Sequence, residues 1–177
     1  MLKKFLAFSI TAIMIFSLSA CGNKEAEEKG DYLSGNKWES TAGMLLDLDK
    51  EGTFKFFKDK SDKEDNYYSG TFEVKNGSEA VEYLEEVHAL PAESQRSAMV
   101  GFGVDENYYY ALILTNKECI ENGANTLSEE NEVAYYGYYM PDYEYLNLYS
   151  LKTMSQYEFY NCLLYTSDAA DEEDSGD

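Results

Sequence analysis

Short runs in which apolar and polar residues alternate, separated by turn residues, recur through most of this chain. In residues 44–48 and 54–56 every second residue is apolar, and Glu51-Gly52 lies between the two runs. A period of two is typical of a half-buried strand, and two such runs around a turn predict a hairpin. The pattern therefore predicts a mostly β fold.

Residues 108–115 are apolar on both faces, which is typical of a central strand. Asn76-Gly77, Asn122-Gly123 and Pro141-Asp142 are dipeptides that favour turns. Together these patterns predict seven or eight antiparallel strands, over 35–40, 44–48, 54–56, 68–74, 108–115, 133–140, 143–150 and 157–161.

One mid-chain helix is predicted over about 78–90. Ser78 is placed to cap it, Glu79 suits the positive end of its dipole, and Pro91 follows it. The segment from there to Val104 is ambiguous. One helix within an antiparallel β chain predicts a small barrel or a strongly curved sheet, with the helix closing one side or end. The expected core comprises Trp38, Leu46, Phe54, Phe56, Phe72, Leu84, Leu112 and Leu114.

Several short motifs resemble those of lipocalin-like domains: Trp38 after Gly35, the turn at 49–52, and the strand motif at 67–72. The layout is more closely similar to small extracytoplasmic proteins of low-GC Gram-positive bacteria. The motifs shared with that family lie at 66–74, 79–83, 135–137 and 146–148. The resemblance implies a lipocalin-like barrel over most of residues 35–160, and it supplies no functional residue because the family has no assigned activity.

The N-terminus has the parts of a secretory signal. Lys3 and Lys4 precede an apolar run over 5–18, and small residues lead to Cys21. Leu-Ser-Ala-Cys resembles the lipobox of bacterial lipoproteins, which implies cleavage after residue 20 and a diacylglycerol on the Cys21 sulfur. The polar segment 22–34 then predicts a flexible tether. An ordinary secretory signal with a chance cysteine is the alternative.

The C-terminus has a different origin. Residues 162–172 match one unbroken reading frame of a transposase-type sequencing-library adapter. We therefore interpret 162–177 as an adapter-derived artefact, with a natural acidic tail as the alternative. A single β-rich domain is then expected over 35–161.

Charge limits the partners of this domain. The chain has 34 acids and 14 bases. Without the six acids of the tail and the two lysines of the signal, 28 acids and 12 bases remain, a net charge of −16. This excess argues against nucleic acid and against adsorption to anionic lipid. We expect a monomer that is attached to the outer face of the cell membrane only through its lipid.

Catalytic and metal-binding motifs are scarce. If Cys21 is lipidated and Cys162 belongs to the adapter, Cys119 has no disulfide partner, and a lone cysteine is usually a small buried hydrophobe. A thiol nucleophile paired with His88, the only histidine, is the alternative. Residues 47–52 imitate the start of an EF-hand loop, but its twelfth position is a lysine where calcium needs glutamate. We expect no cofactor and no metal.

Tyrosine is the strongest bias, with 17 residues. Tyrosine fits pleated strands by packing alone, and its rigid amphipathic ring also suits binding surfaces. The favoured function is a non-enzymatic binding or interaction domain, with an apolar small molecule in the barrel or a protein partner on a tyrosine-rich face. The alternative is a cell-envelope hydrolase, or a modulator of one, that uses clustered carboxylates. The candidate binding residues are Tyr135, Tyr136, Tyr138, Tyr139, Tyr143 and Tyr145.

Overall fold

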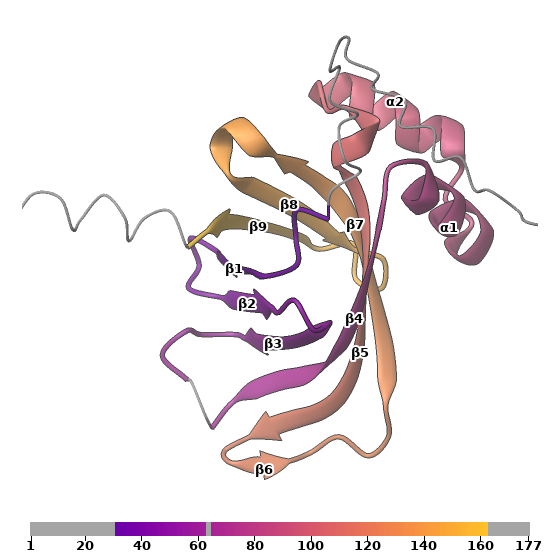
Figure 1. Ribbon diagram of the computed structural model, residues 1–177. Coiled ribbons are helices and arrows are strands. Elements are labelled where there is room, and N and C mark those ends of the chain that lie inside the picture. Colours follow the sequence, from indigo (N-terminus) through magenta and orange to yellow (C-terminus); the bar gives the residue numbers. More distant parts are fainter. Residues whose placement is uncertain (1–30, 63–64, 163–177) are drawn as a thin grey trace, which may run out of the picture.

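The computed structural model describes residues 31–62 and 65–162, which form a β-barrel with two helices on its outside (Figure 1). Eight strands make up the barrel, and the two-residue β6 (Ala124–Asn125) extends the edge of β5. The barrel strands are β1 (Asn36–Glu39), β2 (Leu45–Leu48), β3 (Thr53–Phe57), β4 (Tyr67–Asn76), β5 (Tyr109–Glu121), β7 (Asn131–Met140), β8 (Tyr145–Ser150) and β9 (Gln156–Asn161).

The strands follow one another around the barrel in the order β4-β3-β2-β1-β9-β8-β7-β5, and β5 pairs back with β4 to close the ring. All these pairings are antiparallel. The early and late parts of the chain meet where β1 pairs with β9, with Trp38 opposite Asn161. The predicted fold class, an antiparallel lipocalin-like small barrel, is confirmed.

The strand β5 is buried on both of its faces. Leu112 and Leu114 point into the barrel and belong to its inner core. Ala111 and Ile113 alternate with them and belong to a second cluster, between the outside of the barrel and the helices. This two-sided burial explains why the sequence of this strand is apolar throughout.

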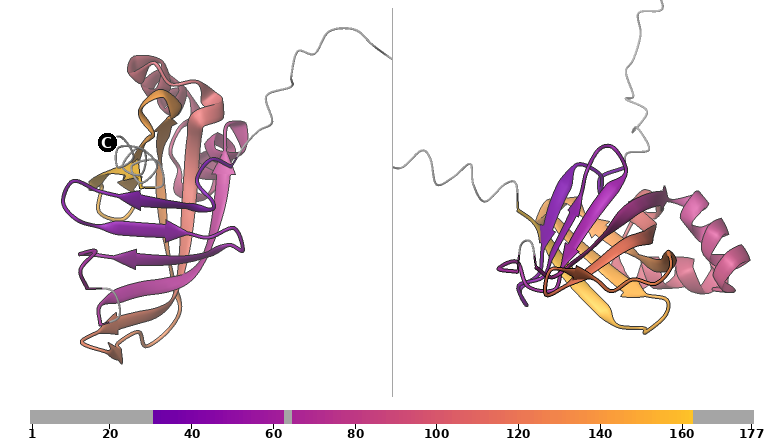
Figure 2. Two further views of the ribbon diagram at one scale, coloured as in Figure 1. Left: turned by 60° about the vertical axis from the view of Figure 1, so that its left-hand side comes forward. Right: turned by 90° about the horizontal axis from the view of Figure 1, so that it is seen from below.

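The predicted helix is α1 (Ser78–His88), and it packs against β4 and β5. Ser78 is its first helical residue and does not cap it: the N-cap position is Gly77, with a φ of 59° that favours glycine. Leu84, which we expected in the barrel core, lies in the second cluster. The helix therefore covers the outer side of the barrel (Figure 2).

A second helix, α2 (Ala92–Phe102), occupies the segment that was ambiguous in the sequence. Only Gln95 and Met99 are buried among its eleven residues, so it has almost no apolar stripe. The helix ends at Gly103, whose left-handed conformation allows its N–H to bond back to Val100. A short 3₁₀ turn, η1 (Glu106–Tyr108), leads from there into β5.

The inner core fills the barrel. Phe56 and Phe72 are only half buried, and they pack against this core from its edge. Five of the eight expected core residues are members of it. The full set is Leu33, Trp38, Leu46, Leu48, Phe54, Tyr110, Leu112, Leu114, Tyr139, Leu146, Leu148 and Phe159.

The segment before β1 belongs to the domain. Leu33 is fully buried, and the Asp31 carboxylate accepts hydrogen bonds from the backbone N–H groups of Leu33 and Ser34. The ring of Tyr32 packs on Tyr139. The predicted tether over 22–34 is therefore too long, because its last four residues close one end of the barrel.

The predicted signal, Cys21 and most of the predicted artefact lie outside the described residues. Cys162 is described, and its N–H donates a hydrogen bond to the Lys37 carbonyl oxygen at 2.8 Å. Among residues 31–62 and 65–162, no helix has the length and apolar character needed to cross a membrane.

Candidate functional site

The six candidate tyrosines do not share one surface. Tyr135 and Tyr139 point into the barrel, where they contact or belong to the inner core. Tyr136 and Tyr138 alternate with them on β7 and point outward. Tyr145 on β8 lies beside Tyr138, with ring centroids 6.5 Å apart, so it shares the outer face. Tyr143 is 73% exposed in the turn η2 (Pro141–Tyr143) and faces solvent.

The described side chains of the barrel interior leave little space between them. The space among its side chains measures about 20 Å³ and is lined by apolar residues and by Tyr135 and Tyr157. Burial raises the pKa of Tyr135 to about 12. The inward tyrosines are therefore packing residues of the core.

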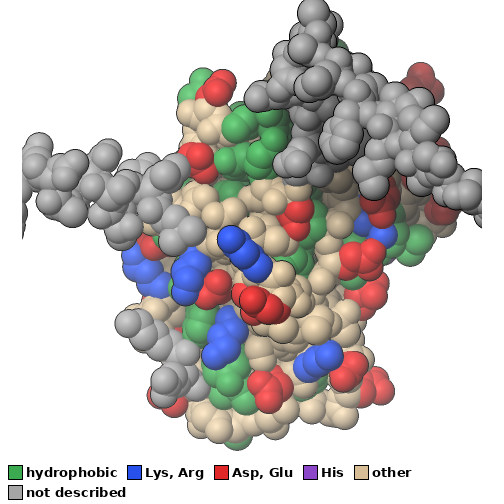
Figure 3. All heavy atoms as spheres, viewed as in Figure 1, with side chains coloured by type: hydrophobic (Ala, Val, Ile, Leu, Met, Phe, Trp, Pro, Cys, Tyr) green, Lys and Arg blue, Asp and Glu red, His purple; other side chains and the backbone are tan. Residues whose placement is uncertain are grey.

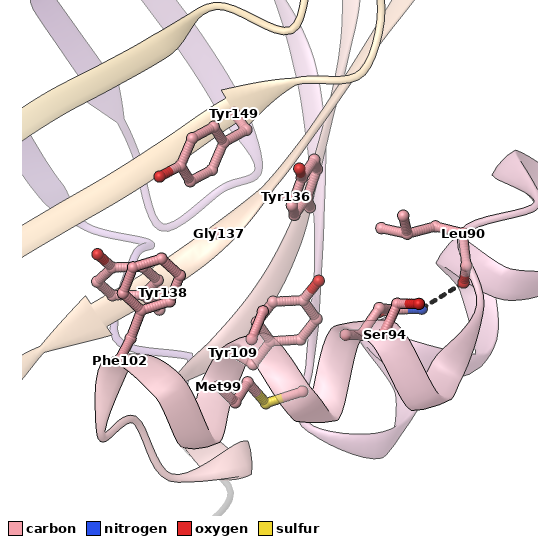
Figure 4. A pocket seen from close by; sticks show the side chains of 11 residues that line it. Leu90, Ser94, Met99, Phe102, Tyr109, Tyr136, Gly137, Tyr138 and Tyr149 are labelled. Atoms are coloured by element: carbon pink, nitrogen blue, oxygen red, sulfur yellow. Dashed lines mark hydrogen bonds between the residues drawn. The ribbon is translucent and has the colours of Figure 1, made fainter.

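A larger pocket lies outside the barrel, between α2 and the outer faces of β5, β7 and β8 (Figure 4). We call it the outer pocket. Its volume is about 120 Å³. It is lined by Leu90, Ser94, Gln95, Ala98, Met99, Phe102, Tyr109, Tyr136, Gly137, Tyr138 and Tyr149.

Two pairs of aromatic rings flank this pocket. Tyr136 and Tyr149 lie opposite each other on β7 and β8, and their rings stack with centroids 5.4 Å apart. Phe102, at the end of α2, lies against Tyr138 with centroids 5.3 Å apart. Gly137 lies between the two pairs (Figure 4). The wall of the outer pocket is thus rich in aromatic rings, and no charged residue of the described part of the chain lines it.

Gln95 contributes an unusual polar group to this wall. Its Nε2 donates hydrogen bonds to the carbonyl oxygens of Val81 at 3.1 Å and Leu90 at 2.7 Å (Figure 4, dashed line). Two carbonyl acceptors fix which end of the amide is the nitrogen. The side chain is 3% exposed, and its Oε1 has no hydrogen-bond partner among the described residues.

A second buried amide on the outer face of the barrel also has an oxygen without a hydrogen-bond partner among the described residues. Asn147 on β8 donates from Nδ2 to the hydroxyl oxygens of Tyr138 and Tyr145, both at 3.1 Å. Tyr145 in turn bonds to the Glu158 carboxylate, and burial together with this bond raises the pKa of Tyr145. Asn147 is 2% exposed, and its Oδ1 also lacks a partner among the described residues.

These two atoms are the only buried side-chain polar atoms without a partner in the described part of the chain. Both are acceptors. Gln95 lines the outer pocket, and Asn147 bonds to Tyr138, which also lines it. A buried acceptor without a donor costs free energy, so its presence in a folded protein calls for an explanation such as an absent binding partner.

Charge is distributed unevenly around the molecule. On the face made by β1 to β4, lysines and acids are interspersed (Figure 3), and Lys37 pairs with Asp47 at 2.7 Å. The segment 78–106, which carries both helices, has seven acids and one base. That base, Arg96, pairs with Glu106 at 3.4 Å. The segment that carries the helices is therefore acidic, whereas α2 itself, which lines the outer pocket, has one acid, Glu93, and one base.

The candidate catalytic groups are far apart. Cys119 is buried at the β6 end of β5, whereas His88 ends α1 at the opposite end of the molecule (Figure 1). The His88 Nε2 lies 3.2 Å from the Tyr83 hydroxyl. Cys119 and Cys162 are both free. Cys119 is the small buried hydrophobe that a lone cysteine was expected to be.

Acidic chemistry is also unsupported by the geometry. None of the Asp and Glu side chains in the described residues is buried, so no carboxylate lies in an apolar pocket there. Asp49 accepts hydrogen bonds from the Thr53 N–H and hydroxyl, which fixes the β2–β3 turn and lowers the pKa of Asp49. Within the described ranges no group of His, Cys, Asp and Glu could hold a metal ion.

Comparison with known proteins finds no matching family model, no matching curated sequence and no matching solved structure.

The sequence did not identify four important residues of the outer pocket, Gln95, Phe102, Tyr109 and Tyr149. Two of them lie on α2, whose weak amphipathic pattern hid the helix. One signal was present in the sequence. The predicted strand over 108–115 is apolar on both faces, so its outer face must be covered, and residues 92–102 were the segment to which no element had been assigned.

Proposed function

We propose that this protein is a lipid-anchored, extracytoplasmic binding domain that takes a small ligand in the outer pocket. The anchor is inferred from the lipobox-like sequence that ends at Cys21. The binding function rests on one observation above all: an aromatic pocket lined by Gln95, whose buried Oε1 has no partner among the described residues.

The size of the pocket limits the ligand to one compact group. A cavity of about 150 Å³ accommodates a single benzene ring, and the outer pocket measures about 120 Å³. The space among the described side chains of the barrel interior, at about 20 Å³, is too small for such a group. The ligand, or the part of it that binds, is therefore a single ring or a single branched head group.

A direct test uses the methyl group of Met99 as a reporter, because Met99 lines the outer pocket and is buried. Small single-ring and single-head-group compounds, neutral and charged, are titrated into the purified full chain, and the assigned Met99 methyl signal is followed by NMR. We expect at least one compound to shift this signal in a saturable way.

A matched pair of variants on α2 locates the effect. Ala98 lines the outer pocket and Ser97 does not, and both are exposed. Ala98→Leu should fill the pocket and abolish the shift, whereas Ser97→Leu should preserve it. The proposal is wrong if no compound shifts the Met99 signal, or if Ala98→Leu leaves every shift unchanged.

A further inference from the structure

We propose that the outer pocket selects a small organic cation with a compact alkylammonium head group, of which trimethylammonium is the type. This inference rests on the binding function proposed above and names the chemical class of its ligand. Three independent observations support it: the aromatic wall, the unpartnered acceptor of Gln95 and the net negative charge of the chain.

The aromatic wall is suited to a cation. Five rings line or border a pocket of about 120 Å³, those of Phe102, Tyr109, Tyr136, Tyr138 and Tyr149. The face of an aromatic ring carries negative electrostatic potential, and rings around a small space attract a quaternary ammonium group. Leu90, Ala98 and Met99 add apolar contacts to this aromatic wall.

The unpartnered polar atoms have the sign that a cation requires. Gln95 Oε1 and Asn147 Oδ1 are both carbonyl oxygens, the negative ends of their amide dipoles. The amide nitrogens of both side chains are already used, by Val81 and Leu90 in one case and by two tyrosine hydroxyls in the other. Gln95, which lines the pocket, thus has an unused acceptor and no unused amide donor.

The surrounding charge acts in the same direction. No Lys or Arg among the described residues lines the outer pocket. The segment 78–106 has seven acids against one base, and the chain without the predicted signal and artefact has a net charge of −16. A field of this sign raises the local concentration of cations and repels anions.

The trimethylammonium group occurs both in free solutes and in phosphatidylcholine head groups. We commit to the free solute, because a pocket of about 120 Å³ between α2 and the barrel wall holds one head group. The experiment below separates the two sources.

The central comparison is between choline and its neutral carbon isostere, 3,3-dimethylbutan-1-ol. Each is titrated into the full chain carrying Cys21→Ser, which removes the lipid anchor, with the Met99 methyl signal and calorimetry as readouts. We expect choline to bind at least tenfold more tightly than the isostere, and its affinity to fall as salt is added.

Two variants at one position test the aromatic contribution. Tyr149→Phe keeps the ring and should change choline affinity less than threefold, whereas Tyr149→Leu removes the ring and should weaken it about tenfold. Neither change removes a described hydrogen bond. Phosphatidylcholine vesicles provide the lipid arm, and the Cys21→Ser chain should not cosediment with them.

The outcomes separate this inference from the proposed function. Equal binding of choline and the isostere, or a Met99 shift caused only by neutral compounds, overturns cation selectivity and leaves the binding function intact. If the chain cosediments with the vesicles and does not bind choline, the inference that the ligand is a free solute is wrong. The absence of any Met99 shift with every compound overturns the binding function itself.

Discussion

The indole Nε1 of Trp38 donates a hydrogen bond to the carbonyl oxygen of Leu33 at 3.2 Å, and both side chains are fully buried. The indole also meets the ring of Tyr139 edge to face, with centroids 5.7 Å apart. Trp38 therefore connects β1, β7 and the segment that closes the barrel end.

Removing this side chain should be costly. Trp38→Ala should lower the free energy of unfolding by about 3–5 kcal/mol, because it leaves a large cavity in the inner core. Urea denaturation measures the loss. Tyr143→Ala, at a position 73% exposed, is the control and should change stability by less than about 0.5 kcal/mol. A Trp38→Ala loss below about 1 kcal/mol would contradict the burial of this residue.

Two glycines should respond to alanine in opposite ways. A Cβ on Gly137 would overlap the backbone carbonyl of Asn147 across the β7–β8 pair, so Gly137→Ala should cost about 1–3 kcal/mol or more. Gly101 lies within α2 with no atom near its Cβ position, and Gly101→Ala should add about 0.5–1 kcal/mol. Equal effects at the two positions would show that β7 and β8 are not paired in this register.

Alkaline pH should weaken the fold through its buried tyrosines. Burial raises the pKa of Tyr135 to about 12 and also raises the pKa values of Tyr109 and Tyr110, whereas an unfolded tyrosine titrates near 10. The folded state thus retains protons that the unfolded state releases. The contribution of this difference to the free energy of unfolding is fully present below about pH 10 and is lost as the pH rises from about 10 through 12.

Urea midpoints over that pH range measure this loss, and tyrosinate absorbance assigns it to tyrosine rather than lysine. A stability that stays constant between about pH 10 and 12 would be inconsistent with the burial of these rings.

The predicted lipid anchor can be tested with Cys21→Ser, which replaces the sulfur atom of this side chain by oxygen. Expressed in a bacterium, the natural chain should partition into detergent and carry diacylglycerol on Cys21. Cys21→Ser should remain unprocessed or be released. If the variant is cleaved after residue 20 and still stays on the membrane, the lipobox interpretation is incorrect.

The origin of the C-terminus can be read from DNA. A gene sequence obtained from genomic DNA that never received the adapter should diverge from this chain at about Cys162. The hydrogen bond from the Cys162 N–H to the Lys37 carbonyl oxygen requires only backbone atoms, so another residue at that position could form it. Identical codons in adapter-free DNA would overturn this interpretation.

The strands were predictable because their side chains alternate with a period of two that the sequence displays directly. Which tyrosines point into the barrel and which point outward could not be predicted, because the direction of each side chain depends on the strand register. Tyr136 faces Tyr149 across β7 and β8, and Tyr135 points to the other side. The outer pocket was equally hidden, since it joins α2 to three strands that are separate in the sequence.

The two-sided burial of β5 has a consequence for how the molecule moves. Its backbone amides over 110–114 lie between two packed layers, so we expect them to exchange with deuterium only when the whole domain unfolds. The same strand carries Tyr109, a wall of the outer pocket. A ligand in the outer pocket would therefore contact the strand that we expect to be the most rigid, and we expect any movement that admits the ligand to occur in α2.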